Sequence, residues 1–115
     1  MSWKPTWWKR SRPRSEGLRS AAMVIGLLLL DIHFPHARSL KDKRHHLHRI
    51  KDRIRQKYNV AVAELDFQDK WQRTQIGLVT ISNEKQLVEN ALNRIRAEIQ
   101  ETTEGEVLSA EIQLL

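Results

Sequence analysis

The sequence predicts an α+β domain with the element order βαββαβ. Four segments have apolar runs or strand-period alternation, and two have apolar residues at helical spacing. Short polar connectors separate them. Right-handed crossovers then place both helices on one face of a four-stranded antiparallel sheet, the ferredoxin-like arrangement. We therefore expect one domain over residues 23–115, preceded by a basic, tryptophan-containing, disordered extension over residues 1–22.

The first strand is expected over residues 23–33, where the nearly continuous apolar run is typical of a central strand. Basic residues precede this run, and the two together resemble a secretion signal. The apolar part, residues 21–30, is too short to span a bilayer, and no small-residue cleavage site follows it. We therefore expect a buried strand that ends before Pro35, no membrane partner and a cytoplasmic location.

The first helix is expected over residues 39–58. Ser39 is a suitable N-cap, and Asp42 stands three residues later in a capping-box position. Lys43, Arg44 and Lys51 border a narrow apolar stripe, and we expect their charges to reach water. The stripe comprises Leu40, Leu47, Ile50, Ile54 and Tyr58.

Two strands then form a hairpin, over residues 60–65 and from Trp71 or Gln72 to Ile81. A polar connector, residues 66–70, joins them. In the second of these strands, even-numbered residues such as Ile76 share one face, and odd-numbered residues share the other.

The second helix is expected after Ser82 or Asn83 as its cap, with Arg94 and Glu98 as a stabilising surface pair. Its apolar stripe comprises Leu87, Val88, Ala91, Leu92, Ile95 and Ile99. The last strand, residues 106–115, alternates cleanly, with Leu108, Ala110, Ile112 and Leu114 on one face.

The charge of the first helix exceeds what a helix needs to fold. Residues 39–58 hold eight Lys or Arg, three His and two Asp, a formal +6, which equals the net charge of the whole chain. Like-charged pairs at i,i+4, such as Lys51 and Arg55, cost about 0.2–0.5 kcal/mol each. This surplus indicates an anionic partner, and its spread around the helix suits phosphate-backbone contact. The expected nucleic-acid-binding residues are Lys41, Arg44, Arg49, Arg53 and Arg55.

No cofactor or metal site is expected. The chain has no cysteine, its helical histidines form no i,i+4 pair, and it has no H-E-x-x-H motif. Nucleophile-elbow, phosphate-loop and dinucleotide patterns are also missing, which disfavours an enzyme. Three carboxylates near the predicted hairpin (Glu64, Asp66 and Asp69) leave catalytic or cation-binding use open, but a turn with an Asp69–Arg73 ion pair is the simpler interpretation. Glu64 and Asp66 are expected on one strand face.

Two stretches resemble the signatures of the YlxP-like family, small bacterial proteins of unknown function. They are residues 33–44, HFPHARSLKDKR, and residues 62–73, VAELDFQDKWQR. The resemblance covers residues 23–115 and implies a ferredoxin-like fold. It implies little biochemistry. The second stretch is expected to be a family-signature hairpin with a structural or partner-contacting role, and its residues are Glu64, Asp66, Gln68, Asp69, Trp71, Gln72 and Arg73. Genes of this family commonly lie among those for translation and ribosome-maturation factors, which associates the family with RNA.

Two functions remain open. The first is a non-enzymatic RNA- or ribosome-associated module that binds phosphates through the basic helix. The second is a homodimeric interaction domain or small-ligand domain, because the uncovered sheet face is expected to be partly apolar. No small-molecule substrate is indicated.

Overall fold

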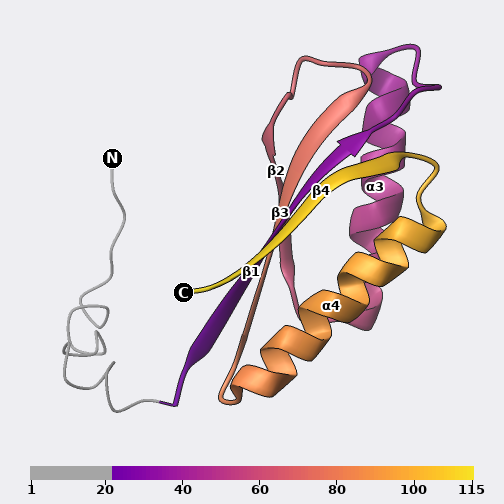
Figure 1. Ribbon diagram of the computed structural model, residues 1–115. Helices are drawn as coiled ribbons and strands as arrows, with labels where there is room; N and C mark the ends of the chain where they lie inside the picture. Colours follow the sequence, from indigo (N-terminus) through magenta and orange to yellow (C-terminus); the bar gives the residue numbers. More distant parts are fainter. Residues whose placement is uncertain (1–21) are drawn as a thin grey trace, which may run out of the picture.

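The protein was analysed as a computed structural model, which describes residues 22–115. The predicted order βαββαβ is confirmed (Figure 1). The elements are β1 (Val24–His33), α3 (Leu40–Lys57), β2 (Ala61–Asp66), β3 (Arg73–Ser82), α4 (Lys85–Thr102) and β4 (Glu106–Leu114). The predicted extension over residues 1–22 lies outside the described residues except for its last residue.

The four strands form one antiparallel sheet in the order β2-β3-β1-β4, and both helices lie on the same side of it (Figure 1). This confirms the ferredoxin-like α+β fold. Leu28, Leu30 and Ile32 of β1 are fully buried beneath the helices, since alternate residues of a strand point to opposite faces. Ile76 and Leu78 of β3 are also fully buried, as the predicted alternation requires.

The strand pairing is irregular at two places, and each contradicts a prediction of which residues share a face of the sheet. In β2, Glu64 pairs with Ile76 but Asp66 pairs with Gln75, so the register shifts at Leu65. Glu64 and Asp66 therefore do not share a face, because an extra residue in a strand reverses the alternation that follows it.

A register shift also interrupts the pairing of β4 with β1. Asp31 pairs with Ser109 and Ile32 pairs with Val107, which leaves Leu108 without a partner on β1. Val107 packs against the core, while Leu108 is 52% exposed. The predicted clean alternation of this strand is therefore wrong at Leu108.

Helix α4 differs from its prediction at its surface. Its N-cap is Glu84, whose side chain makes no capping hydrogen bond, rather than Ser82 or Asn83. Leu87 was expected in the apolar stripe but is 52% exposed. Glu98 pairs with Lys57 of α3 instead of Arg94, because the two helices lie close enough for a contact between them.

Candidate functional site

Helix α3 starts as its sequence predicts. Ser39 is the N-cap, and its Oγ accepts a hydrogen bond of 3.1 Å from the Asp42 backbone N–H. The Asp42 carboxylate in turn accepts a hydrogen bond from the Arg38 N–H, one residue before the cap. These contacts satisfy two backbone donors at the start of the helix.

Lys43 contradicts its prediction. Its side chain does not reach water but is 0% exposed. The ammonium Nζ lies 3.1 Å from Glu64 Oε2 and donates to the backbone carbonyl oxygens of Phe67 at 2.6 Å and of Gln68 and Arg73 at 3.4 Å. A buried ammonium needs such a set of acceptors, since burying an unpaired charge is very costly.

The remaining cations of α3 divide between two flanks. One series recurs at alternating intervals of three and four residues, so its members share one side of the helix. We call this series the basic stripe: Lys41, Arg44, His48, Lys51 and Arg55. Within residues 22–115, none of its members forms an ion pair. Arg55 donates to the Val62 carbonyl oxygen at 3.2 Å, which places this flank beside β2.

The opposite flank faces α4 and is largely neutralised. Arg49 and His46 both lie 3.4 Å from the Glu104 carboxylate, and Lys57 pairs with Glu98. His46 also stacks on the ring of Phe34, with 5.2 Å between ring centroids. This histidine therefore has a structural role at the helix–sheet boundary.

The predicted nucleic-acid-binding residues separate accordingly. Lys41, Arg44 and Arg55 belong to the basic stripe, whereas Arg49 is paired with Glu104. Arg53 is exposed, forms no ion pair in the described part of the chain, and lines a hollow of about 140 Å³ that Glu104 also lines.

The β2–β3 hairpin is built around the Lys43 contact. Glu64, which receives the ammonium group, also accepts a hydrogen bond of 2.6 Å from the Thr74 hydroxyl group. Phe67 has a φ of 63°, in the left-handed region that residues with a Cβ rarely adopt. This conformation places the Phe67 carbonyl oxygen on Lys43, and the Asp66 carboxylate accepts from the Phe67 N–H.

Arg73 does not pair with Asp69 as predicted. Its guanidinium makes two hydrogen bonds with the Asp31 carboxylate, at 3.2 and 3.3 Å, and lies 4.7 Å from the centroid of the Phe67 ring. His33 pairs with Arg73 in the β1–β3 register. Asp31, two residues before His33, lies on the same face of β1 and is therefore within reach of the Arg73 side chain. The pairing depends on the strand register, so sequence spacing alone did not reveal it.

The two stretches that carry the family resemblance lie together. The Gln72 side-chain amide donates to the carbonyl oxygens of Pro35 and Ala37, at 3.2 and 3.1 Å. The Gln72 carbonyl oxygen accepts from the Phe34 N–H at 2.8 Å. Together with Lys43, these contacts join the β1–α3 connection, the first turns of α3 and the hairpin into one unit.

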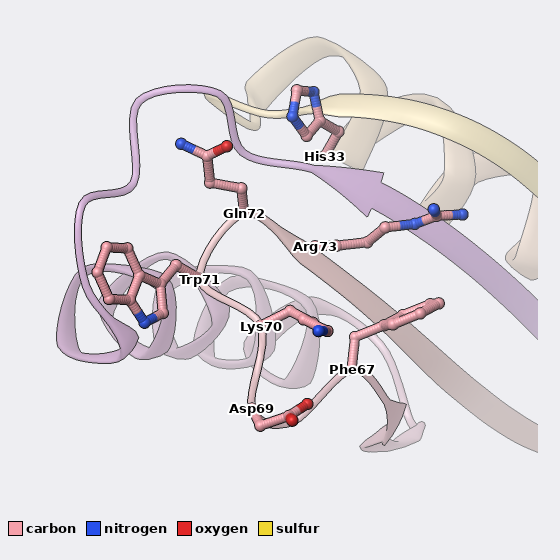
Figure 2. A pocket seen from close by; sticks show the side chains of 7 residues that line it. All are labelled: His33, Phe67, Asp69, Lys70, Trp71, Gln72 and Arg73. Atoms are coloured by element: carbon pink, nitrogen blue, oxygen red, sulfur yellow. The ribbon is translucent and has the colours of Figure 1, made fainter.

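An open hollow of about 610 Å³ lies at this end of the sheet. Figure 2 shows Lys70 between Trp71 and Phe67 along the loop, with His33 across from them at the end of β1. Trp71 is 54% exposed. The residues that line the hollow are His33, Phe67, Asp69, Lys70, Trp71, Gln72 and Arg73.

The uncovered face of the sheet is partly apolar, as expected. Leu65, Val79 and Ile81 are 49%, 38% and 53% exposed. Leu65 and Val79 also line an apolar hollow of about 160 Å³ over β2 and β3. Homodimerisation through this face stays a prediction.

Sequence reasoning missed Lys43, Phe67 and Asp31 as members of the site. For Lys43 there was a usable signal. The spacing of residues 43, 47, 50 and 54 continues the apolar stripe into the first turn, with a lysine in its first place. For Phe67 and Asp31 the determining contacts are tertiary, and the sequence carries no local sign of them.

The described residues contain neither a metal-ligand cluster nor a membrane-spanning helix. In the described part of the chain, no group of three or more His, Asp or Glu side chains is arranged to hold a metal ion. Over the same residues, neither helix is long and apolar enough to cross a membrane.

The fold and the site define a small ferredoxin-like domain in which a buried lysine joins the first helix to the β2–β3 hairpin. The chain belongs to the family described as "Protein of unknown function (DUF503)", whose model matches residues 25–112. Over 61 residues it is 43% identical to "Uncharacterized protein YlxP" of Bacillus subtilis (strain 168). That alignment covers 53% of this chain and 66% of the relative, just under two thirds of its length. The resemblance to small bacterial YlxP-like proteins is thus confirmed.

Two solved structures are similar in fold. One is "De novo designed protein Foldit4", with a TM-score of 0.49, 15% identity, and coverage of 81% of this chain and 96% of the designed one. The other is a C-terminal segment of the alpha subunit of aIF2 from Pyrococcus abyssi. Its TM-score is 0.48 at 21% identity, over 81% of this chain and 49% of that one.

Proposed function

We propose that this domain is a non-enzymatic module that binds the phosphate backbone of structured RNA, ribosomal RNA in the first place, through the basic stripe of α3. The observation that supports this most is the division of charge on the helix. Three of the four basic residues on the flank that faces α4 have carboxylate partners, whereas Lys41, Arg44, His48, Lys51 and Arg55 have none among residues 22–115.

The length of the stripe suits a polyanion better than a single small anion. At about 1.5 Å per residue, the fourteen steps from Lys41 to Arg55 span about 21 Å. Cations spread over that length can meet several phosphates along one strand and release their counterions. Contacts of this kind position a protein on a nucleic acid without reading its sequence.

Salt dependence tests the proposal. Binding of the full chain to a ribosomal RNA fragment is measured by fluorescence anisotropy over a range of salt concentrations. The logarithm of the association constant should fall steeply with the logarithm of salt concentration. Lys41→Glu with Arg44→Glu should weaken binding and reduce that slope by about two, one for each lost phosphate contact. Both side chains are exposed within the first five residues of α3, near the helix end where a carboxylate favours the helix dipole, so the fold should persist.

The matched control is Lys85→Glu with Arg94→Glu, the same charge change at two exposed positions of α4. It should leave the slope nearly unchanged. Equal losses in the two double variants would mean that net charge alone attracts the RNA. A flat dependence of the wild-type chain on salt would reject phosphate binding altogether.

A second candidate function is supported by the exposed apolar residues of the open sheet face. A second copy of the chain that covers Leu65, Val79 and Ile81 would remove them from water. Light scattering should then show a mass that rises from monomer to dimer with concentration. A monomer at every concentration would remove this candidate.

A further inference from the structure

The phosphate binding proposed for the basic stripe does not involve the hollow that Trp71 lines. Trp71 is 54% exposed and lines the hollow. The hollow, about 610 Å³ in volume, is large enough for a planar ring. In Figure 2 the Trp71 indole extends to one side of the loop, whereas the Lys70 and Asp69 side chains extend to the other.

The loop that carries Trp71 is fixed on both sides. Before Trp71, the Phe67 carbonyl oxygen accepts from Lys43 Nζ and from the Lys70 N–H, the latter at 3.0 Å. After it, the Gln72 side chain is held by the carbonyl oxygens of Pro35 and Ala37. An aromatic ring displayed on a fixed loop loses little conformational freedom when it binds a partner.

The backbone of this loop is strained at Phe67. A φ of 63° is unfavourable for a residue with a Cβ, and such strain clusters at functional sites. The Phe67 ring lies against the Arg73 guanidinium at one side of the hollow. The strained conformation therefore helps to shape the wall of the hollow as well as the contact with Lys43.

The charges around the hollow indicate the chemistry of its ligand. Arg73 is occupied by Asp31, and His33 Nδ1 lies 3.7 Å from Glu106. Lys70 and Asp69 remain, one donor and one acceptor of opposite charge, neither with an ion pair in the described part of the chain. Their charges cancel, which disfavours a phosphate. The exposed, flat face of the Trp71 indole suits a nucleobase, because every base has a π-face that can stack on such a ring.

We propose that this hollow takes one unpaired base of an RNA strand. Trp71 supplies the aromatic face on which the base stacks. The inference rests on the proposed function, because the same strand passes its phosphates along the basic stripe. The two features adjoin, since Lys43, whose ammonium group bonds to this loop, stands between Lys41 and Arg44 of the basic stripe at the start of α3.

The test compares two RNA probes on the full chain. One probe is a hairpin with an unpaired loop, and the other is a blunt duplex of the same stem. Trp71→Ala should weaken binding of the looped probe by roughly five- to hundredfold, the range found for loss of one base–aromatic stack. Binding of the duplex should not change. Trp71→Phe, which keeps an aromatic face, should retain most of the affinity.

Salt dependence separates this inference from the proposed function. Trp71→Ala should lower affinity for the looped probe without a change in salt slope, because stacking releases no counterions. Lys41→Glu with Arg44→Glu should reduce the slope for both probes. If Trp71→Ala binds both probes like the wild-type chain while the slope still depends on the stripe, the base subsite is rejected and phosphate binding stands. If the wild-type chain binds neither probe at low salt, both proposals fail.

Two further outcomes would overturn the inference. An equal loss on duplex and looped RNA would show that Trp71 acts on the protein or on phosphates and not on a base. Adenosine monophosphate is titrated into a full-length variant in which Trp3, Trp7 and Trp8 are replaced by Phe, so that Trp71 is its one indole. Quenching of Trp71 fluorescence by the mononucleotide as strong as by the looped probe would assign the hollow to a free nucleotide instead of an RNA strand.

Discussion

Helices α3 and α4 are both 18 residues long and bury four residues at the same spacing, but they differ in the first of the four. In α4 the buried series is Val88, Leu92, Ile95 and Ile99. In α3 it is Lys43, Leu47, Ile50 and Ile54. A lysine therefore stands in one helix where a valine stands at the matching place in the other.

The surroundings of the two positions explain the difference. Val88 packs over Gly26 of β1, where the missing side chain lets the helix approach the sheet closely. Lys43 lies beside the β2–β3 connection, where three backbone carbonyl oxygens and the Glu64 carboxylate converge. Buried oxygen atoms that converge on one position need a hydrogen-bond donor there. A strand surface with a glycine and no polar group needs an apolar side chain instead. The partner layer thus decides which residue type a buried helix position holds.

The largest effect is expected when Lys43 is replaced by Met, which has a similar length and no charge. The substitution leaves Glu64 without its cation and the hairpin carbonyl oxygens without their donor. The free energy of unfolding of the full chain should fall by about 3–5 kcal/mol, the cost of breaking a buried pair. Urea denaturation followed by circular dichroism measures it.

Lys43→Met with Glu64→Gln is the internal check on this value. Gln keeps an acceptor for the Thr74 hydroxyl group and has no charge to leave unpaired. The double variant should be more stable than the sum of the two single effects predicts, by about 1–3 kcal/mol. Strict additivity would mean that Lys43 and Glu64 do not interact in solution.

A smaller effect is expected at Gly26, on the α4 side of the comparison. A Cβ at this position would overlap the Val88 side chain and lie 2.7 Å from Leu92 Cδ1. Gly26→Ala should destabilise the fold by about 1–3 kcal/mol, because the β-branched Val88 cannot turn away easily. The measurement is again urea denaturation.

Two further variants sharpen this result. Val88→Ala in the Gly26→Ala background removes the overlap and should recover part of the loss. Gly77→Ala is the control on the opposite face of the sheet. Its added methyl group meets the side chain of Leu65, which is 49% exposed and free to move. If Gly77→Ala costs as much as Gly26→Ala, the close approach of α4 is not the cause.

The comparison also shows where sequence reasoning ends. Element order and most of both helix stripes follow from local periodicity. Leu87 and Lys43 are the exceptions. The register shifts at Leu65 and Leu108, the Arg73–Asp31 pair and the burial of Lys43 depend on which segments meet. The charge surplus of α3 was visible in the sequence. Its division into a neutralised flank and a free stripe was not, because that division depends on carboxylates 41 to 55 residues away along the chain.

The smallest effects are expected at the two N-caps, where the helices differ again. Ser39 Oγ accepts the Asp42 N–H, whereas the side chain of Glu84 caps nothing. Ser39→Ala should therefore cost about 1 kcal/mol. Glu84 already has the extended backbone of an N-cap, with a φ of −128° and a ψ of 126°. Glu84→Asp shortens the side chain enough for its carboxylate to reach the free N–H groups of the first turn and keeps the charge that favours the helix dipole. It should stabilise the chain by about 0.5–1 kcal/mol in the same denaturation assay, and a loss of stability instead would show that the start of α4 is held by contacts other than its cap.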